Sequence, residues 1–202
     1  MSHEFSENMQ VAIVKYNAGN IQSVSYALNR LGIQPIVTND PDVLYKADKV
    51  IFPGVGDAGT AMPYLRERHL DEVLVSLKQP FLGICFGMQL MCKHSEEGNV
   101  DCLGIFDVNV KRFPSGIEKV PHMGWNTITD LKGTLLKNIS LESYVYFVHS
   151  YYAEMNPFST ATCNYVLPFS AGIEKDNFFA FQFHPEKSGI VGAQILQNFI
   201  EL

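Results

Sequence analysis

The stretch FLGICFG, residues 81–87, decides the fold, because a short apolar run passes directly into a cysteine that stands between glycines. A continuous apolar run of this length is consistent with a buried strand. Gly83 to Gly87 then has the form of a nucleophile elbow, a tight strand-to-helix turn, with cysteine in place of serine. Glycines beside the cysteine remove side chains that would clash in such a turn. The stretch therefore predicts a buried strand, a turn at Cys85 and a helix.

Two interpretations of Cys85 remain open at this point. The helix after the elbow would direct its N-terminus at the sulfur and favour the reactive thiolate. A free cysteine is also commonly buried as a small apolar residue. The elbow alone supports both interpretations about equally.

Strand and helix patterns alternate on the N-terminal side of the elbow. A helical spacing of apolar residues indicates a first helix that begins after Asn20, its candidate cap, and stops at Gly32. The predicted strands are 11–16, 34–37, 50–52 and 81–84, and a second helical stretch covers about 60–77 with a possible break near His69. This alternation predicts a parallel sheet with helices on both faces.

The pattern changes after about residue 100, where short strands and turns predominate. Strands are predicted at 108–111, 125–129, 144–148 and 178–183, and an apolar stripe predicts a packed helix over 189–202. We therefore expect one α/β domain over residues 10–202, with a mixed, mostly parallel central sheet flanked by helices. The polar segment 1–9 is expected to be mobile.

Composition restricts the possible function classes. The 202 residues are 47% hydrophobic, enough for one domain with a substantial core. The formal net charge of −6, with no long run of Lys or Arg, argues against nucleic-acid binding. No stretch approaches the ~18 apolar residues of a membrane helix, and residues 1–10 lack the features of a signal peptide. We expect a cytoplasmic protein that binds neither nucleic acid nor membrane.

The four cysteines have spacings that match neither a zinc site nor a small disulfide framework. Cys92 and His94 could be taken as a pair of metal ligands, but no second pair accompanies them. We expect reduced thiols and no bound metal.

A second group of polar residues, FHPE at 183–186, lies far from the elbow in sequence. In an extended segment, residues two apart point to the same side, so Glu186 could orient His184 while His184 faces Cys85. This is the arrangement of nucleophile, base and orienting group in a catalytic triad. The His–Glu pair alone would more often be a surface pair. Its combination with an elbow cysteine is much rarer, and it predicts a triad of Cys85, His184 and Glu186.

A third signal, PGVG at 53–56, leaves the strand that we expect beside the elbow strand. Glycines there allow the backbone to offer amides to a developing oxyanion, with Val55 and Phe86 as the two donors. Residues 54–59 also match the dinucleotide fingerprint G-x-G-x-x-G. That fingerprint belongs after a first strand, with an acidic residue about 20 positions later, where Gln79 stands here. An oxyanion site is favoured over nucleotide binding.

These motifs together resemble a known family. GICFGMQ at 83–89 with HPE at 184–186 resembles the class I, or triad, glutamine amidotransferases. PHMGWN at 121–126, YFVHS at 146–150 and QFHPEKS at 182–188 are similar to one branch, the glutaminase subunits of imidazole glycerol phosphate synthases from histidine biosynthesis. The resemblance runs from about residue 11 to 202. It implies a flavodoxin-like fold, no cofactor, and hydrolysis of L-glutamine to glutamate and ammonia through a cysteine thioester.

The resemblance also implies roles for single residues. Cys85 would attack the glutamine amide, His184 would shuttle protons and Glu186 would orient His184. Residues implied to hold the substrate are Gly54, Gly56, Gln89, Ser150 and Tyr151. The ammonia would pass to a (β/α)8-barrel cyclase, which makes imidazole glycerol phosphate and AICAR in a heterodimer with this chain. The implied docking face comprises Asn20, Met123, Trp125, Tyr146 and Lys187.

Departures and alternatives remain. Ala58 stands where the family often has an aromatic residue, and Phe86 replaces the commoner leucine. The protein could instead supply a different synthase such as a sugar amidotransferase, be an inactive regulator of the same fold, or be a dehydrogenase that uses residues 54–59. Met88 argues against the anthranilate branch, which typically has histidine there. The glycines of PGVG further suggest a backbone that flips when a partner docks, completing the oxyanion hole with the Val55 amide.

Overall fold

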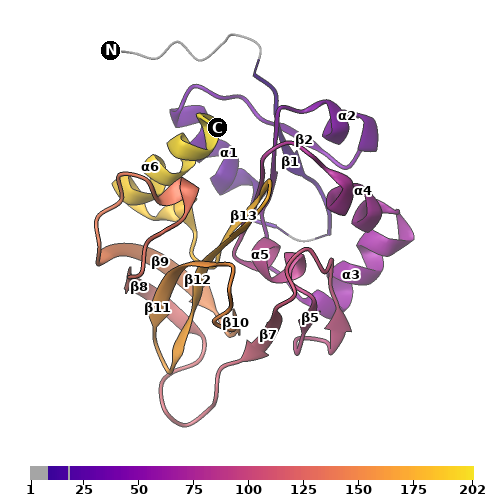
Figure 1. Ribbon diagram of the computed structural model, residues 1–202. Coiled ribbons are helices and arrows are strands. Elements are labelled where there is room, and N and C mark those ends of the chain that lie inside the picture. Colours follow the sequence, from indigo (N-terminus) through magenta and orange to yellow (C-terminus); the bar gives the residue numbers. More distant parts are fainter. Residues whose placement is uncertain (1–8, 18) are drawn as a thin grey trace.

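The computed structural model describes residues 9–17 and 19–202, and in this part of the chain a seven-stranded sheet forms the centre (Figure 1). Its order is β11-β12-β13-β4-β3-β1-β2. The strands from β13 to β2 run parallel, and β12 and β11 are antiparallel at one edge. The bounds are β1 Val11–Val14, β2 Ile36–Thr38, β3 Lys49–Phe52, β4 Phe81–Ile84, β11 Ser159–Asn164, β12 Pro168–Lys175 and β13 Phe178–Phe181. The predicted mixed, mostly parallel sheet is confirmed.

Helices cover both faces of this sheet, as the sequence predicted. The residues of β1 alternate: Val11 and Ile13 pack with α1 and α6, whereas Ala12 and Val14 face the side of α3, α4 and α5. Each face therefore has its own apolar core, and the sheet separates the two. The helices are α1 Ile21–Arg30, α2 Pro41–Lys46, α3 Ala58–Glu67, α4 Leu70–Ser76, α5 Phe86–Met91 and α6 Gly189–Ile200, with 3-10 turns η1 Thr134–Leu136 and η2 Pro185–Lys187.

Two smaller sheets extend the molecule beyond the carboxyl ends of the parallel strands (Figure 1). One has the order β10-β7-β5-β6 and the other is the antiparallel pair β8 and β9. The bounds are β5 His94–Ser95, β6 Val100–Asp101, β7 Asn109–Arg112, β8 His122–Ile128, β9 Ser143–His149 and β10 Tyr151–Ala153. These elements supply the walls of the cavity described below.

Most predicted elements are present, with several differences. The stretch 60–77 breaks at His69, which has φ 54° and separates α3 from α4, as anticipated. Asn20 precedes α1, but its side chain makes no capping hydrogen bond. The six-residue α2, capped by Asp40 and begun by Pro41, was missed because it is shorter than two turns of periodic pattern. The edge strands β11 and β12 were also missed, and the strand predicted to reach 183 ends at Phe181.

The segment 1–9 that we expected to be mobile lies outside the described residues except for Met9, which is partly buried and packs against the core. None of the helices described is long and apolar enough to cross a membrane.

The β8–β9 pair is anchored inside the protein by two buried histidines. His122 lies opposite His149, and their Nδ1 and Nε2 atoms are 3.0 Å apart. His149 Nδ1 is 2.7 Å from the carbonyl of Tyr151, which only accepts, so this nitrogen carries the proton. Burial lowers the pKa of His149 to about 3 and that of His122 to about 4, so both rings are neutral at pH 7.

Because both rings are neutral, each has one N–H, and the hydrogen bonds determine which nitrogen carries it. With its proton on Nδ1, His149 accepts at Nε2 from Nδ1–H of His122, whose own Nε2 then accepts from the amide of Asn126 at 3.3 Å. The amide of Asn126 is oriented in turn, because its oxygen accepts from the Thr127 N–H. A one-directional series of hydrogen bonds therefore runs from β8 to Tyr151.

We predict that these neutral histidines make stability depend on pH. The folded pKa lies below the unfolded value of about 6.5, so this contribution is complete above pH 6.5 and is lost as pH falls toward 3. Within that window, the free energy of unfolding should fall by about 1.4 kcal/mol per pH unit for a proton that only the unfolded chain binds at His149. Urea unfolding of His149→Phe between pH 6 and 4.5 should show a shallower slope than the wild type. The exposed His69, changed to Asn, is the control; equal slopes in all three proteins would contradict the prediction.

Candidate active site

Cys85 occupies the turn between β4 and α5, with a positive φ of 53° and a ψ of −107°. Its amide donates to the Phe181 carbonyl at 2.7 Å, which ties the elbow to β13. A Cβ on Gly87 would lie 1.9 Å from the carbonyl oxygen of Phe52, and one on Gly83 would lie 2.4 Å from the sulfur of Met91. Gly87 is therefore required by the close approach of the β3 backbone, whereas a side chain at Gly83 would displace Met91.

His184 reaches Cys85 from the neighbouring strand β13, and Glu186 contacts His184. His184 follows β13, and its amide donates to the Tyr146 carbonyl at 2.9 Å. Its Nδ1 lies 2.8 Å from Oε1 of Glu186, whose side chain is fully buried in the turn η2. The carboxylate thus holds a proton on Nδ1, which leaves Nε2 available to exchange a proton with another group.

The protonation of His184 depends on its two neighbours, Cys85 and Glu186. His184 Nε2 has no hydrogen-bond partner of ordinary geometry among the described residues. Burial lowers the pKa of His184, but the negative charge of the nearby Cys85 sulfur and the contact with Glu186 outweigh burial and raise it to about 10. This direction means that His184 is protonated at neutral pH and holds a positive charge close to the Cys85 sulfur.

A cavity of about 310 Å³ lies beside the sulfur. Its lining includes seven of the predicted site residues, namely Val55, Gly56, Cys85, Phe86, Gln89, Ser150 and Tyr151, together with Glu97, Pro121, Val148 and His149. Gly54 does not line it: a Cβ there would lie 2.5 Å from the Tyr16 hydroxyl. His184 and Glu186 are also absent from the lining. The predicted triad and the cavity therefore meet at Cys85.

Hydrogen bonds hold the PGVG loop before and after the peptide that joins Gly54 to Val55. The Pro53 carbonyl accepts from the Tyr16 hydroxyl at 2.8 Å, and the Val55 carbonyl accepts from the Gly19 amide at 3.2 Å. The peptide that joins Gly54 to Val55 makes no hydrogen bond to the described residues. This single peptide is therefore the least constrained part of the loop, next to the cavity.

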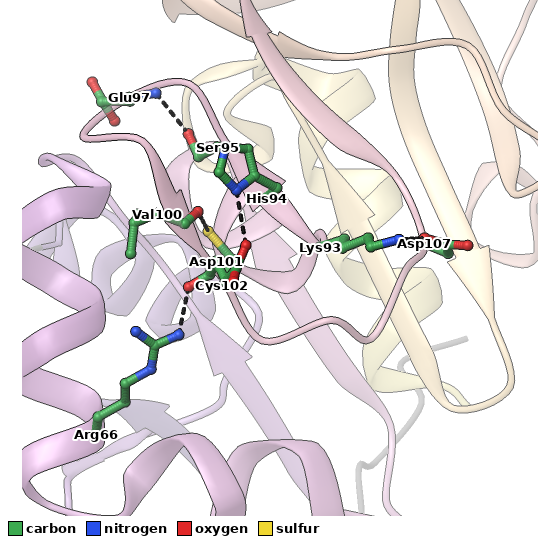
Figure 2. Close-up of polar contacts among 9 residues, drawn as sticks. All are labelled: Arg66, Lys93, His94, Ser95, Glu97, Val100, Asp101, Cys102 and Asp107. Atoms are coloured by element: carbon green, nitrogen blue, oxygen red, sulfur yellow. Dashed lines mark hydrogen bonds and ion pairs between the residues drawn. The ribbon is translucent and has the colours of Figure 1, made fainter.

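Glu97 is a cavity residue that the sequence analysis missed. It lies in the turn between β5 and β6, where its amide donates to the Ser95 hydroxyl at 3.1 Å (Figure 2). Its carboxylate accepts from the Ala58 amide at 3.3 Å. Burial raises the pKa of Glu97, which the contact with the Ala58 amide partly counteracts.

The hairpin that carries Glu97 is fixed by its neighbours. His94 and Asp101 face each other across it at 2.9 Å, and Arg66 of α3 donates to the Asp101 carbonyl at 2.7 Å (Figure 2). No motif marks Glu97 in the sequence, because pairing of β5 with β7, a tertiary contact, brings it to the cavity.

An exposed apolar surface lies on the outer face of β8 and β9. Met123 and Trp125 expose 63% and 55% of their surface although both are large apolar residues. Trp125 lies opposite Tyr146 with their ring centroids 6.0 Å apart, and Lys187 Nζ is 5.9 Å from the Tyr146 ring. The fifth predicted docking residue, Asn20, has no hydrogen bond or ring contact to these four among the described residues.

Within the described ranges, no group of three or more His, Cys, Asp or Glu residues is placed to hold a metal ion. Cys92, Cys102 and Cys163 lie apart from the cavity lining. Burial raises the pKa of all three thiols, to about 12 for Cys102 and Cys163. Cys85 is the cysteine that lines the cavity.

Comparison with known proteins agrees with this geometry. Residues 12–202 match the family model for class I glutamine amidotransferases. Imidazole glycerol phosphate synthase subunit HisH of Bacteroides fragilis is 60% identical over 196 residues, which are 96% of this chain and 100% of the relative. The subunit HisH of Escherichia coli K12 is 47% identical over the same shares.

A solved structure shows the same fold at low identity. The structure of PurLQS from Thermotoga maritima superposes with a TM-score of 0.69 at 16% identity, covering 95% of this chain and 97% of that one. The chain therefore belongs to the class I glutamine amidotransferase family, and within it to the imidazole glycerol phosphate synthase subunit HisH family.

Proposed function

We propose that this chain is the glutaminase subunit of an imidazole glycerol phosphate synthase, which hydrolyses L-glutamine and supplies ammonia for histidine biosynthesis. The observation that carries the proposal is the elbow cysteine, paired with a buried His184–Glu186 couple and open to a 310 Å³ cavity. The HisH names of relatives that span nearly the whole chain support the same assignment.

The chain's own groups account for each proton. The Cys85 thiolate attacks the side-chain amide carbon, and His184 gives its Nε2 proton to the leaving nitrogen, which departs as ammonia. The remaining glutamyl thioester is attacked by water, with neutral His184 now accepting the water proton. Cys85 then leaves as thiolate, and the new carboxylic acid loses its proton to solvent as glutamate is released. Amides of Phe86 and Val55 stabilise the oxyanion in both steps.

The cavity supplies groups for both ends of the amino acid. L-glutamine carries an ammonium and a carboxylate at neutral pH. The half-buried carboxylate of Glu97 suits the ammonium, and the backbone of Gly56, Ser150 and Tyr151 provides polar groups around the rest. Gln89 lines the same wall, one helical turn after Cys85.

The outer face of β8 and β9 is the proposed docking surface for a (β/α)8-barrel cyclase, in a heterodimer in the cytoplasm. Ammonia must reach the acceptor unprotonated, because ammonium is not a nucleophile. Exposed Met123 and Trp125, beside Tyr146, give this face the methionine and aromatic side chains that are enriched at interfaces. The Tyr146 carbonyl also holds the His184 amide, so docking acts close to the triad.

Replacement of Cys85 tests the nucleophile. Cys85→Ala should abolish glutamine hydrolysis while the circular dichroism spectrum stays that of the wild type, because alanine removes the thiol and little volume. A glutamine-analogue alkylator, followed by mass spectrometry, should label Cys85 and spare the other three, whose pKa values burial raises. Turnover retained in Cys85→Ala would disprove this role.

Replacement of Glu186 tests the orienting group. Glu186→Gln keeps the shape but removes the charge that holds the proton on Nδ1 of His184, so kcat should fall by roughly 10²–10⁴-fold. Because triad members act as a unit, His184→Ala combined with Glu186→Gln should be little worse than His184→Ala alone. Independent losses that multiply would show that the two residues do not act together.

The gating of the oxyanion loop gives a further prediction. We propose that the unbonded Gly54–Val55 peptide directs its N–H away from the substrate in the free chain and flips when the loaded partner docks. A missing oxyanion donor costs roughly 10²–10³-fold in rate, so the partner should raise kcat by at least that factor.

The variant for this test is Gly56→Val, since substitution at Gly54 would also disturb its packing on Tyr16. A β-branched residue restricts the backbone beside the peptide and should flatten the response to the partner. Glutamine hydrolysis is measured with and without partner and acceptor ligand. Full activity of the free wild-type chain would refute the gating.

A further inference from the structure

Gln182 is a buried polar residue that the triad does not explain. It follows β13, two residues before His184, and is fully buried. Its Nε2 lies 3.6 Å from the sulfur of Cys85, and its Oε1 lies 3.0 Å from Nε2 of Gln89. Burial of an amide is unfavourable unless its polar atoms find partners, and both partners of this amide are at the candidate active site.

The orientation of the Gln182 amide follows from the Tyr151 carbonyl. A carbonyl only accepts, so the Gln89 atom 2.9 Å from it must be the NH₂ group. That same NH₂ group faces Gln182, which must therefore present its oxygen. The NH₂ group of Gln182 then points to Cys85. The Tyr151 carbonyl thus determines which way the Gln89 amide faces, and Gln89 determines which way the Gln182 amide faces.

The Tyr151 carbonyl is itself held firmly. Besides the Gln89 amide, it accepts the Nδ1–H of neutral His149 at 2.7 Å, so both of its lone pairs have donors. Tyr151 also begins β10 and pairs with Arg112 of β7. Reversal of the Gln89 amide would set two oxygens against each other at this carbonyl, which opposes any reorientation of Gln182.

We propose that Gln182 is a further catalytic residue, whose amide N–H donates a hydrogen bond to the Cys85 sulfur in an orientation that Gln89 and the Tyr151 carbonyl impose. The proposal rests on the proposed function, which makes Cys85 the nucleophile. With the charged His184 near it as well, the sulfur is stabilised as an anion by two groups. The bond favours the thiolate of the free enzyme, and again the thiolate that leaves when water breaks the thioester.

The test measures alkylation of Cys85 by iodoacetamide as a function of pH in the full chain, with the labelled peptide quantified by mass spectrometry. Gln182→Leu removes the donor, so the inflection of the profile should rise by about one pH unit, which is roughly tenfold slower alkylation below the inflection. Gln182→Glu keeps the size of the side chain but places a carboxylate at the sulfur, so its inflection should rise further. An unchanged inflection in both variants overturns the proposal.

Two further variants isolate the role of orientation. Gln79→Leu removes an amide that donates to the Leu44 carbonyl outside the cavity lining, and it should leave the profile unchanged. Gln89→Leu leaves Gln182 in place but removes the amide that orients it, so the inflection of the profile should rise by less than in Gln182→Leu. The double variant of Gln89→Leu with Gln182→Leu should match Gln182→Leu alone, because the two act through one bond. Effects that add would overturn the imposed orientation.

Alkylation by iodoacetamide requires no glutamine chemistry, so the two proposals fail separately. If the profiles shift as expected but the wild type with its partner hydrolyses no glutamine, the proposed function is contradicted and the Gln182–Cys85 hydrogen bond is still supported. Glutamine hydrolysis with unshifted profiles would contradict the role of Gln182 alone.

Discussion

The contact between Gly87 and the carbonyl of Phe52 is the constraint on which the site depends. Only a residue without a side chain lets α5 begin so close to β3, and this proximity forces the chain to turn sharply at Cys85. The positive φ of Cys85, a non-glycine residue, is a strained feature, and the surrounding sheet maintains it. The amide of Cys85, bonded to β13, completes the restraint. The position of the sulfur is therefore determined by backbone packing and not by loops.

The same packing brings the other groups into place. Because β13 pairs in parallel with β4, the residues after both strands emerge at one edge of the sheet. Gln182, His184 and Glu186 leave β13 there, beside the elbow. The two small sheets, one of which is the β8–β9 pair, then enclose this edge, which is the usual location of a ligand site in an open α/β sheet. An ordinary parallel pairing thus converts two distant sequence motifs into one centre.

Local signals in the sequence predicted the central strands, the long helices and the closeness of His184 and Glu186. These features depend on short apolar runs, on glycines at a turn and on residues two apart in an extended segment, all of which are visible in a few neighbouring residues. Glu97 could not be found in this way, because the pairing of β5 with β7 brings it to the cavity. The network around Gln182 was hidden for a similar reason: its polarity is set by Tyr151, a residue distant in sequence that contacts it only through Gln89.

The short turn η2 has a consequence for engineering. Glu186, buried against His184, and Lys187, exposed beside Tyr146, are consecutive residues of one 3-10 turn and share a peptide group. A surface redesigned at Lys187 to accept another protein must therefore preserve the backbone path of this turn, so that the Glu186 carboxylate keeps its contact with His184. Side-chain exchange is open to the designer there, whereas insertion, deletion or loop grafting is not. The proposed docking surface and the candidate active site are in this sense a single module that would have to be transplanted together.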